Sequence, residues 1–371
     1  MENLKILHVS ESFGWSGGAA QLLLLAWKLG EKGITNYIAC PPGGDLWNKA
    51  LAANFPVFPF NPKKDYYFLA GARLAREINR KEINIVHAHH PKAHTMALVG
   101  KILSKNKPIL IVSRRVSHPM KKNFFARVKY VNRYINGYIA VAEAVKKILV
   151  LYGVPKEKIE VIYSGVDENK FCPRKPSVKI MTELKISEKD KPIGLIGNFS
   201  FEKGQHILLK AAAEIKDKYP VVLIFAGRET DSKEIKELAR KCGFPPERAR
   251  FLGLRDDIDE IISVLSLCVN CAVSGEALSG SARESMAMGI PVVASDIAGN
   301  REIVLDRKTG LLFPPGDFKR LSKLISLIFE DKNASRLLVS AGVKLVRSRF
   351  TVSRMVEKTL NFYLKLGDFK V

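Results

Sequence analysis

The chain has 371 residues and a formal net charge of +23, from 60 Lys and Arg against 37 Asp and Glu. Such a charge predicts an anionic partner, which can be nucleic acid, a membrane surface or a phosphorylated substrate. Hydrophobic residues make up 47% of the chain, as in globular proteins with sizeable cores, and the length suggests about two domains. The odd number of cysteines argues against a disulfide framework, and no apolar stretch approaches the ~20 residues of a membrane span.

The first residues, MENLKILHVS, enter a strand-like run without the pattern of a signal peptide. Apolar runs and helical patterns then alternate, which predicts parallel strands joined by helices. The strand candidates of the first half are residues 4–10, 36–40, 83–89, 108–113, 137–141 and 159–166. After the first candidate, Gly14, Gly17 and Gly18 leave room for an anionic ligand at a helix start. Their spacing is not G-x-G-x-x-G, so it does not predict a nicotinamide cofactor.

Histidines gather in VHAHHPKAH, residues 86–94. His87 and His89 share one face of the predicted strand, whereas His90 points away and Pro91 interrupts the geometry. No acid or cysteine nearby completes a ligand set, so the run predicts a polar wall of a cleft rather than a metal centre, and a structural role is the alternative.

Residues 113–133, SRRVSHPMKKNFFARVKYVNR, contain seven Arg or Lys, no acid and several aromatic residues. This combination predicts a surface that faces phosphate groups or an anionic membrane. A solvated helix face is the alternative interpretation.

A second series of strand candidates follows the Pro- and Lys-bearing stretch near 170–180: residues 192–198, 221–227, 249–253, 267–273, 290–296 and 309–315. We therefore predict two Rossmann-like, doubly wound domains, 1–172 and 173–348, facing each other across a cleft. The helical pattern of 349–371 is expected to cross back onto the first domain. Ligands of such sheets bind at the carboxyl ends of the strands, so residues just after strands are the candidates for a site.

The first post-strand loop of the second domain, NFSFEKGQ, contains Asn198 and Lys203. A Lys at the start of a helix is unfavourable to the helix dipole, which prefers anions there. A phosphate bound by both Lys203 and the helix end would explain its presence, whereas a solvent-exposed Lys is the alternative.

The segment SGEALSGSARESMAMGIPVV, residues 274–293, carries Glu276 and Glu284 on either side of mostly small residues. Small residues let phosphates reach the amides of a helix start, and carboxylates accept hydrogen bonds from hydroxyl groups, so the segment predicts a nucleotide sugar. Ser281 and Glu284 also have the spacing of a capping box, which is the structural alternative.

Two nearby patterns resemble metal sites but have structural explanations. Asp257 and Asp259 fit the first turn of a helix, where the dipole favours acids. Cys268 and Cys271 lie in an apolar strand-like run without a second cysteine pair, so we interpret them as buried thiols.

These segments in this order resemble the retaining glycosyltransferases of family 4, which have the GT-B fold. The resemblance extends over essentially the whole chain, from SGGAAQLLLLAWKLGEKG through GNFSFEKGQHILLKAA to EALSGSARESMAMGIPVVASDIAGNREIV and TGLLFPPGD. The SRRV segment is similar to members that build lipopolysaccharide or other envelope glycans.

The resemblance implies a role for each candidate residue. Glu276 and Lys203 would be catalytic, with Glu276 at the transferred sugar and Lys203 at the donor diphosphate. The implied donor-binding residues are Gly17, Gly18, Asn198, Lys203, Leu278, Ser279, Gly280 and Glu284. His89, Arg114, Arg115 and His118 are assigned to the acceptor or sugar side. Asn198 stands where the family usually has Arg, and Ala277 where it commonly has Gly, so Arg114, Arg115 or Arg228 is expected to compensate.

The predicted activity is transfer of a sugar, with retention, from a nucleoside diphosphate donor to a cell-envelope glycan or lipid-linked acceptor. No metal or cofactor is required and no nucleic acid is expected as partner. We expect a cytoplasmic protein, peripheral on the inner face of the cell membrane, and the few Gln among many Lys suggest a thermophile. The alternatives are a catalytically altered nucleotide-sugar or anionic-surface binding protein and a GT-B-like nucleotide-sugar epimerase.

Overall fold

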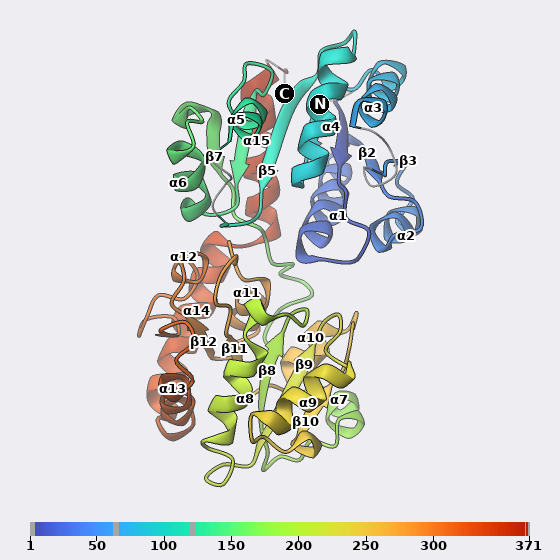
Figure 1. Ribbon diagram of the computed structural model, residues 1–371. Helices are drawn as coiled ribbons and strands as arrows, with labels where there is room; N and C mark the ends of the chain where they lie inside the picture. The colour runs from blue at the N-terminus through green and yellow to red at the C-terminus, as the bar shows by residue number, and fades with distance from the viewer. Residues whose placement is uncertain (1–3, 62–66, 119–122, 368, 370–371) are drawn as a thin grey trace. The chain divides into compact units, whose positions relative to one another are not determined.

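The computed structural model describes residues 4–61, 67–118, 123–367 and 369. The chain divides into two compact units (Figure 1): unit 1 is Met1–Gly165 with Val352–Val371, and unit 2 is Val166–Thr351. We predicted the crossings at 172–173 and 348–349. In the structure they fall at 165–166 and 351–352, where the amide of Val166 donates a hydrogen bond of 2.7 Å to the carbonyl oxygen of Phe350.

Unit 1 is built on a seven-stranded parallel sheet in the order β3-β2-β1-β4-β5-β6-β7. Its strands are β1 (Lys5–Val9), β2 (Thr35–Cys40), β3 (Val57–Pro59), β4 (Ile85–Ala88), β5 (Ile109–Arg114), β6 (Gly137–Ala140) and β7 (Ile159–Val161). Its helices are α1 (Gly17–Gly30), α2 (Asp45–Ala52), α3 (Tyr67–Lys81), α4 (Pro91–Leu103), α5 (Phe124–Tyr130), α6 (Glu143–Leu151) and α15 (Val352–Gly367), with the 3₁₀ turn η1 (Lys156–Lys158).

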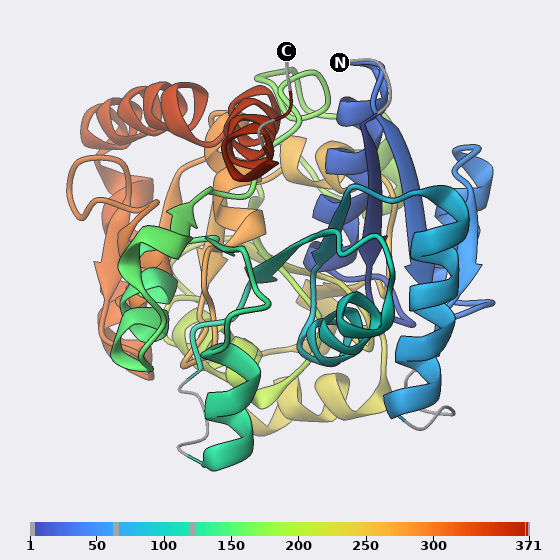
Figure 2. The same ribbon diagram turned by 90° about the horizontal axis from the view of Figure 1, so that it is seen from above.

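The last helix of the chain completes the core of this first unit. Met355, Val356, Leu360 and Tyr363 of α15 are buried in one cluster with apolar residues of β1, β4, β5 and β6. In Figure 2, α15 lies on one face of the sheet and α3 and α4 lie on the other. The periodic apolar face that the sequence shows in 352–366 is therefore the face that meets unit 1.

Unit 2 is built on a six-stranded parallel sheet in the order β10-β9-β8-β11-β12-β13. Its strands are β8 (Lys191–Ile196), β9 (Val221–Ala226), β10 (Ala249–Phe251), β11 (Leu267–Asn270), β12 (Val292–Ser295) and β13 (Leu311–Phe313). Its helices are α7 (Val178–Glu183), α8 (Gln205–Ala213), α9 (Lys233–Lys241), α10 (Ile258–Ser263), α11 (Gly280–Ala287), α12 (Ala298–Arg301), α13 (Phe318–Glu330) and α14 (Lys332–Arg349), with the 3₁₀ turns η2 (Phe201–Lys203) and η3 (Pro246–Arg248).

Burial on both faces explains why the strands are apolar throughout. Every residue of β9, VVLIFA, is buried, as expected for a parallel sheet covered by helices on both sides. In unit 2, α8 packs with α13, whereas α11 packs with α10 and α14. The two parallel, helix-covered sheets confirm the predicted pair of Rossmann-like, doubly wound domains. None of the helices in the described part of the chain combines the length and apolarity that crossing a bilayer requires.

Candidate functional site

The start of α11 is defined by Ser279, which caps the helix. The Ser279 hydroxyl accepts a hydrogen bond of 3.3 Å from the amide of Ala282. The first amides of a helix have no partner inside it, so those of Gly280 and Ser281 point out of the helix end and suit an anion. Because Ser279 is the capping residue, the alternative of a Ser281–Glu284 capping box is wrong, and Glu284 lies one turn inside α11.

A buried polar network holds the loop that leads from β11 to α11. Asn270, the last residue of β11, donates a hydrogen bond of 2.9 Å to the Ser279 hydroxyl. Its side-chain oxygen accepts hydrogen bonds of 3.1 Å from the amide of Ala272 and from the side chain of Asn300. Ser295 at the end of β12 donates to the carbonyl oxygen of Ala272 at 2.5 Å. The sequence analysis missed these residues; polar side chains that end apolar strands are the signal that could have found them.

Lys203 and Glu276 meet in an ion pair. The Lys203 ammonium donates a hydrogen bond of 2.6 Å to a Glu276 carboxylate oxygen, and the side chains are 38% and 12% exposed. Lys203 ends η2, directly before Gly204, whose φ is +71°. A Cβ at Gly204 would overlap the carbonyl oxygen of Cys271, so glycine lets the backbone press against the end of β11. This close approach brings the ammonium to the loop that carries Glu276.

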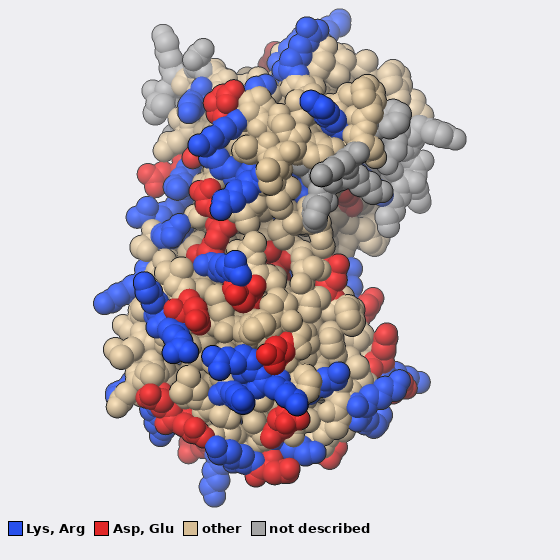
Figure 3. Space-filling model, turned by 60° about the vertical axis from the view of Figure 1, so that its left-hand side comes forward, with Lys and Arg blue, Asp and Glu red and all other residues tan. Residues whose placement is uncertain are grey.

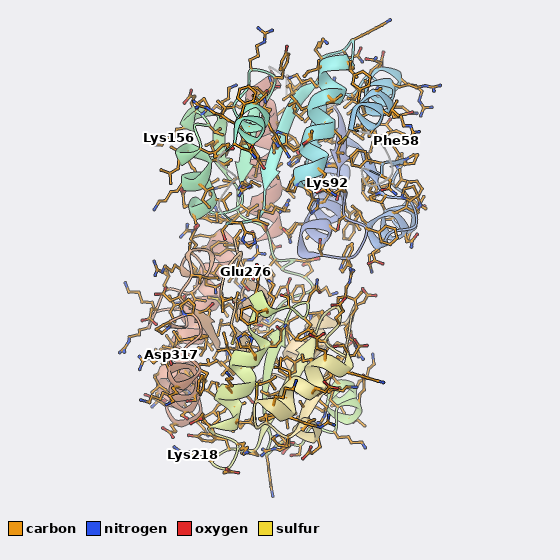
Figure 4. All side chains as sticks on the ribbon, viewed as in Figure 1. Phe58, Lys92, Lys156, Lys218, Glu276 and Asp317 are labelled. Atoms are coloured by element: carbon orange, nitrogen blue, oxygen red, sulfur yellow. The ribbon has the colours of Figure 1, made fainter. Side chains whose placement is uncertain are left out.

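Glu284 is a half-buried carboxyl group beside the start of α11. Burial raises its pKa, and the positive charges of Arg283 and Lys170 oppose that shift. Arg283 is buried, its Nε donates a hydrogen bond of 3.1 Å to the carbonyl oxygen of Ser279, and burial lowers its pKa to about 10. Gly280 lies within 4 Å of both side chains, measured from the position of its missing Cβ. Figure 4 shows Glu276 at the end of unit 2 where α11 begins.

Asn198 joins the loops that follow β8 and β9. Its side-chain oxygen accepts a hydrogen bond of 3.0 Å from the amide of Arg228, and its carbonyl oxygen accepts one of 3.0 Å from Gln205. Asn198 therefore fixes the main chain next to the half-buried Arg228, in the sheet end that also carries Lys203. Leu278 is buried, so a ligand would reach its main chain rather than its side chain.

The two acids that resemble a metal-binding pair are held by cations. Asp257, at the start of α10, forms an ion pair of 2.7 Å with Arg255, and Asp259 forms one of 2.9 Å with Arg174. This arrangement agrees with their interpretation as acids of a helix start. Cys268 and Cys271 are buried thiols.

In unit 1, the glycine-rich loop packs against the histidine run. Ser16 caps α1 by accepting a hydrogen bond of 3.3 Å from the amide of Ala19. A Cβ at Gly18 would lie 2.9 Å from Nε2 of His90, whereas Gly17 has open space around it. Close packing against His90 thus explains the glycine at position 18, whereas the glycine at position 17 leaves the helix start accessible to a ligand.

The histidines form a buried hydrogen-bonded network that includes His8, which the sequence analysis missed. Nδ1 of His8 lies 3.0 Å from Nε2 of His89, and Nε2 of His8 lies 3.0 Å from the side-chain oxygen of Asn36. His87 contacts the hydroxyls of Tyr363 at 2.6 Å and Ser113 at 2.7 Å. Burial lowers the pKa of His8 to about 4 and holds the pKa values of His87 and His89 well below their ordinary range.

Ligand nitrogens of His8, His87 and His89 lie within 4.8 Å of one another, so the cluster is geometrically able to hold a metal ion. Its nitrogens are instead engaged with protein groups, and the Arg115 charge adds to the lowering of all three pKa values. The same positive charge disfavours a cation. We therefore interpret the cluster as a buried polar network with a structural role.

The acceptor-side candidates gather at the end of β5. Arg115 donates a hydrogen bond of 3.1 Å to the Ser164 hydroxyl and lies 3.5 Å from Nδ1 of His89. Arg114 donates one of 2.5 Å to the carbonyl oxygen of His118. The structure thus brings His89, Arg114, Arg115 and His118 together within unit 1, and brings Lys203, Glu276, Ser279, Gly280 and Glu284 together within unit 2.

Comparison with known proteins agrees with this architecture. The family model described as Glycosyltransferase Family 4 matches residues 15–170, and the one described as Glycosyl transferases group 1 matches residues 178–344. The crystal structure of HepE from Anabaena in complex with UDP-glucose has a TM-score of 0.84 and 22% identity, covering 97% of this chain and 99% of that one. The D-inositol 3-phosphate glycosyltransferase of Xylanimonas cellulosilytica is 23% identical, covering 97% of this chain and 90% of the relative.

A further relative, the phosphatidyl-myo-inositol mannosyltransferase of Mycobacterium leprae, is 24% identical over 79% of this chain and 76% of its own length. The two family models together take in most of the chain. The chain therefore belongs to glycosyltransferase family 4 and has the GT-B fold. This membership makes it a glycosyltransferase and does not favour the epimerase or binding-protein alternatives.

Proposed function

We propose that the protein transfers a sugar from a nucleoside diphosphate donor to a cell-envelope glycan or lipid-linked acceptor, with retention at the anomeric carbon. The observation that carries the proposal is the contact between Lys203 and Glu276 beside the capped start of α11, with Glu284 one turn further on. HepE, which has the same fold, was crystallised with UDP-glucose.

In this proposal unit 2 binds the donor. The amides that begin α11 and the Lys203 ammonium receive the diphosphate, because both supply positive charge to an anion. The main chain of Leu278 and Ser279 lies along the path by which the diphosphate reaches these amides. Glu284 accepts hydrogen bonds from the ribose hydroxyls, and these favour its ionised form against the effect of burial. Asn198 contributes by holding the main chain of the neighbouring loop.

The chemical step separates charge. As the bond from the anomeric carbon to the diphosphate breaks, negative charge grows on the leaving oxygen, which Lys203 and the helix start stabilise. Positive charge grows on the sugar, and Glu276 stabilises it near the reacting face. The acceptor hydroxyl attacks the same face that the diphosphate leaves, within one ternary complex and without a covalent intermediate, and its proton passes to the departing diphosphate oxygen. Because Lys203 and the amides neutralise the diphosphate, the proposed reaction uses no metal or other cofactor.

Unit 1 receives the acceptor. The loop at Gly17 and Gly18 offers a helix start, and His89, Arg114, Arg115 and His118 supply polar groups at the end of β5. Burial and nearby charges keep His89 neutral, and its ring, in contact with His8 and Arg115, helps to position the Arg115 guanidinium.

We further propose peripheral contact with the anionic inner face of the cell membrane through α5. Phe124 is 75% exposed and Val128 50% exposed, and Arg127 and Arg133 accompany them. Exposed apolar side chains among basic ones suit an anionic interface. On the face shown in Figure 3, Lys and Arg are interspersed with Asp and Glu. Vesicles with anionic lipid should bind the protein more weakly after replacement of Phe124 and Arg127 together by Ser and Gln, and equal binding would contradict this contact.

The decisive experiment is a thermal-shift panel of nucleotide sugars, followed by assay of the stabilising donor with candidate acceptors. We expect one nucleoside diphosphate sugar to raise the melting temperature, and the anomeric configuration to be retained in the product. Lys203→Ala and Glu284→Ala should abolish the shift. Salt-sensitive binding of nucleic acid without any response to nucleotide sugars would contradict the proposal.

A further inference from the structure

Unit 1 contains a small cavity beside the end of β5. Its volume is about 40 Å³, and Arg114, Arg115, His94 and Tyr130 are among the residues that line it. None of its described lining residues is acidic. A volume of this size holds about three waters or one small oxyanion. The cavity lies at the carboxyl edge of the sheet, where ligands of doubly wound folds bind.

Arg114 is the unusual residue of this cavity. It is 7% exposed, and Nε of its guanidinium has no hydrogen-bond partner among the described residues. Its two terminal nitrogens contact the carbonyl oxygen of His118 at 2.5 Å and the Tyr130 hydroxyl at 3.4 Å. No ion pair joins Arg114 to a carboxylate in the described part of the chain. A buried charge without a counter-charge is costly, so the site favours an anion from outside the protein.

The surroundings add positive charge rather than compensate it. Lys129 donates a hydrogen bond of 2.5 Å to the carbonyl oxygen of Pro91, a lining residue. Burial, together with the Arg114 charge, lowers the pKa of Lys129 to about 8, and Glu11 opposes the shift. Glu11 is the nearby acid, and its oxygens already accept hydrogen bonds of 3.0 and 2.5 Å from the amides of Lys92 and Ala93 at the start of α4. Figure 4 shows Lys92 at this end of α4.

The histidines of the cavity remain neutral. Burial lowers the pKa of His90 to about 4 and the pKa of His94 well below its ordinary value, with the Lys129 charge adding to the effect on His94. A neutral imidazole donates one hydrogen bond and accepts another, so these rings can orient an oxyanion while the arginines supply the charge.

We propose that Arg114 anchors a binding subsite for one tetrahedral oxyanion, which in the catalytic cycle is a phosphoryl group carried by the acceptor. The planar guanidinium binds such a group through paired N–H donors. This inference rests on the proposed transferase function, since it names the class of acceptor: a phosphate-bearing molecule. It assigns to Arg114 the recognition of the acceptor and leaves the donor diphosphate to Lys203 and α11.

The test uses inorganic phosphate as probe and compares the full-length protein with Arg114→Gln at constant ionic strength. Phosphate should raise the melting temperature of the wild type and not of the variant, whose phosphate affinity should fall at least about tenfold. Without phosphate, Arg114→Gln should melt no lower than the wild type, because it removes an uncompensated buried charge. Arg133→Gln, an exposed arginine of the same segment, is the matched control and should respond like the wild type.

Two further variants distinguish phosphate bound at Arg114 from phosphate bound in the donor site. Lys203→Ala should keep the phosphate response and lose the response to a nucleoside diphosphate, and the opposite result would place phosphate in the donor site and overturn the inference. Arg114→Lys keeps the positive charge but lacks the planar guanidinium. Its phosphate affinity should be at least about threefold lower than that of the wild type, and this result would support the subsite even if Arg114→Gln fails to fold. An unchanged affinity would contradict the subsite. Absence of any nucleotide response, with the phosphate response intact, would instead refute the proposed donor site alone.

Discussion

The Lys203 ammonium donates its 2.6 Å hydrogen bond to the Glu276 carboxylate across 73 residues of sequence. Both side chains keep contact with solvent, so the pair contributes little to stability, at most about 1 kcal/mol. The ion pair matters because it fixes the position of the Lys203 ammonium. In the proposed function, the carboxylate holds the ammonium beside the start of α11 until a donor diphosphate replaces it.

Lys203→Ala should reduce turnover far more than stability. We expect kcat to fall about 10²-fold or more, as when one stabilising group of a developing anion is removed. The free energy of unfolding should change by less than about 1 kcal/mol. Lys218→Ala is the control, since it breaks a 2.5 Å ion pair with Glu330 on the surface of the same unit. Equal activity in the two variants would remove Lys203 from the mechanism.

Glu284→Gln should stabilise the empty protein and weaken donor binding. Because burial raises the folded-state pKa of Glu284, the stability that this group contributes is greatest at low pH and is lost as the pH rises through that raised pKa. The variant should therefore melt above the wild type at pH 7 to 8, and the difference should vanish in acid. Calorimetric melts across this pH range measure the effect.

Donor affinity should depend on pH in the direction opposite to the stability of the empty protein. The ribose hydroxyls need the ionised carboxylate, so nucleotide affinity of the wild type falls as the pH is lowered through the raised pKa of Glu284. Glu284→Gln should bind at least about tenfold more weakly and without that pH dependence. Glu330→Gln is the matched variant, because Lys218 and Tyr219 lower the pKa of Glu330 at an exposed position. A pH-independent wild-type affinity would show that Glu284 does not contact the donor.

Ser279→Ala tests the cap of α11. Loss of the cap should cost about 1 kcal/mol and should also lower donor affinity, since it disturbs the amides that we assign to the diphosphate. Asp317→Ala removes a comparable cap, in which Asp317 accepts a hydrogen bond of 2.8 Å from the amide of Arg320. Chemical denaturation should give a larger loss for Ser279→Ala, because it also leaves the buried side-chain N–H of Asn270 without its partner, and only Ser279→Ala should change nucleotide binding.

Gly204→Ala tests the close approach that positions Lys203. The new methyl group would overlap the carbonyl oxygen of Cys271 at a left-handed backbone, so unfolding should become easier by several kcal/mol or Lys203 should shift and activity fall. Gly316→Ala shares the positive φ, +87°, but has nothing within 4 Å, and should cost only about 1–2 kcal/mol. Similar melting temperatures and full activity in both variants would contradict this role of Gly204.

The two sheets were predictable because their strands are buried on both faces and leave continuous apolar runs such as β9. The three-residue strand β3 was not, because VFP is too short to show a period. Lys203, Glu276 and Glu284 stand out locally, since each is a charged residue just after a strand or at a helix start. The position of the cap was ambiguous, because two serines of LSGSARE lie within one turn of the helix start.

The supporting groups of the site were harder to find. Asn270 and Asn300 meet only because β11 and α12 are neighbours in the folded unit, and nothing local marks either residue as a partner of Ser279. His8 looked like one residue of an apolar strand, yet parallel pairing sets it opposite His87. The sequence places Arg114 on the acceptor side and also offers it as a substitute for a missing diphosphate contact. Its burial beside Tyr130, which depends on how β5 and α5 pack, could not be predicted, and it supports the acceptor role proposed above.

The return of α15 to unit 1 has a consequence for how the chain is made. Residues 166–351 are contiguous, so this half can reach its final form as soon as it leaves the ribosome. The half that emerges first has to wait, because the hydroxyl that contacts His87 belongs to Tyr363 and the apolar wall around it belongs to the last helix. The buried core of unit 1 is therefore complete only once α15, which is synthesised after all of unit 2, has packed into it.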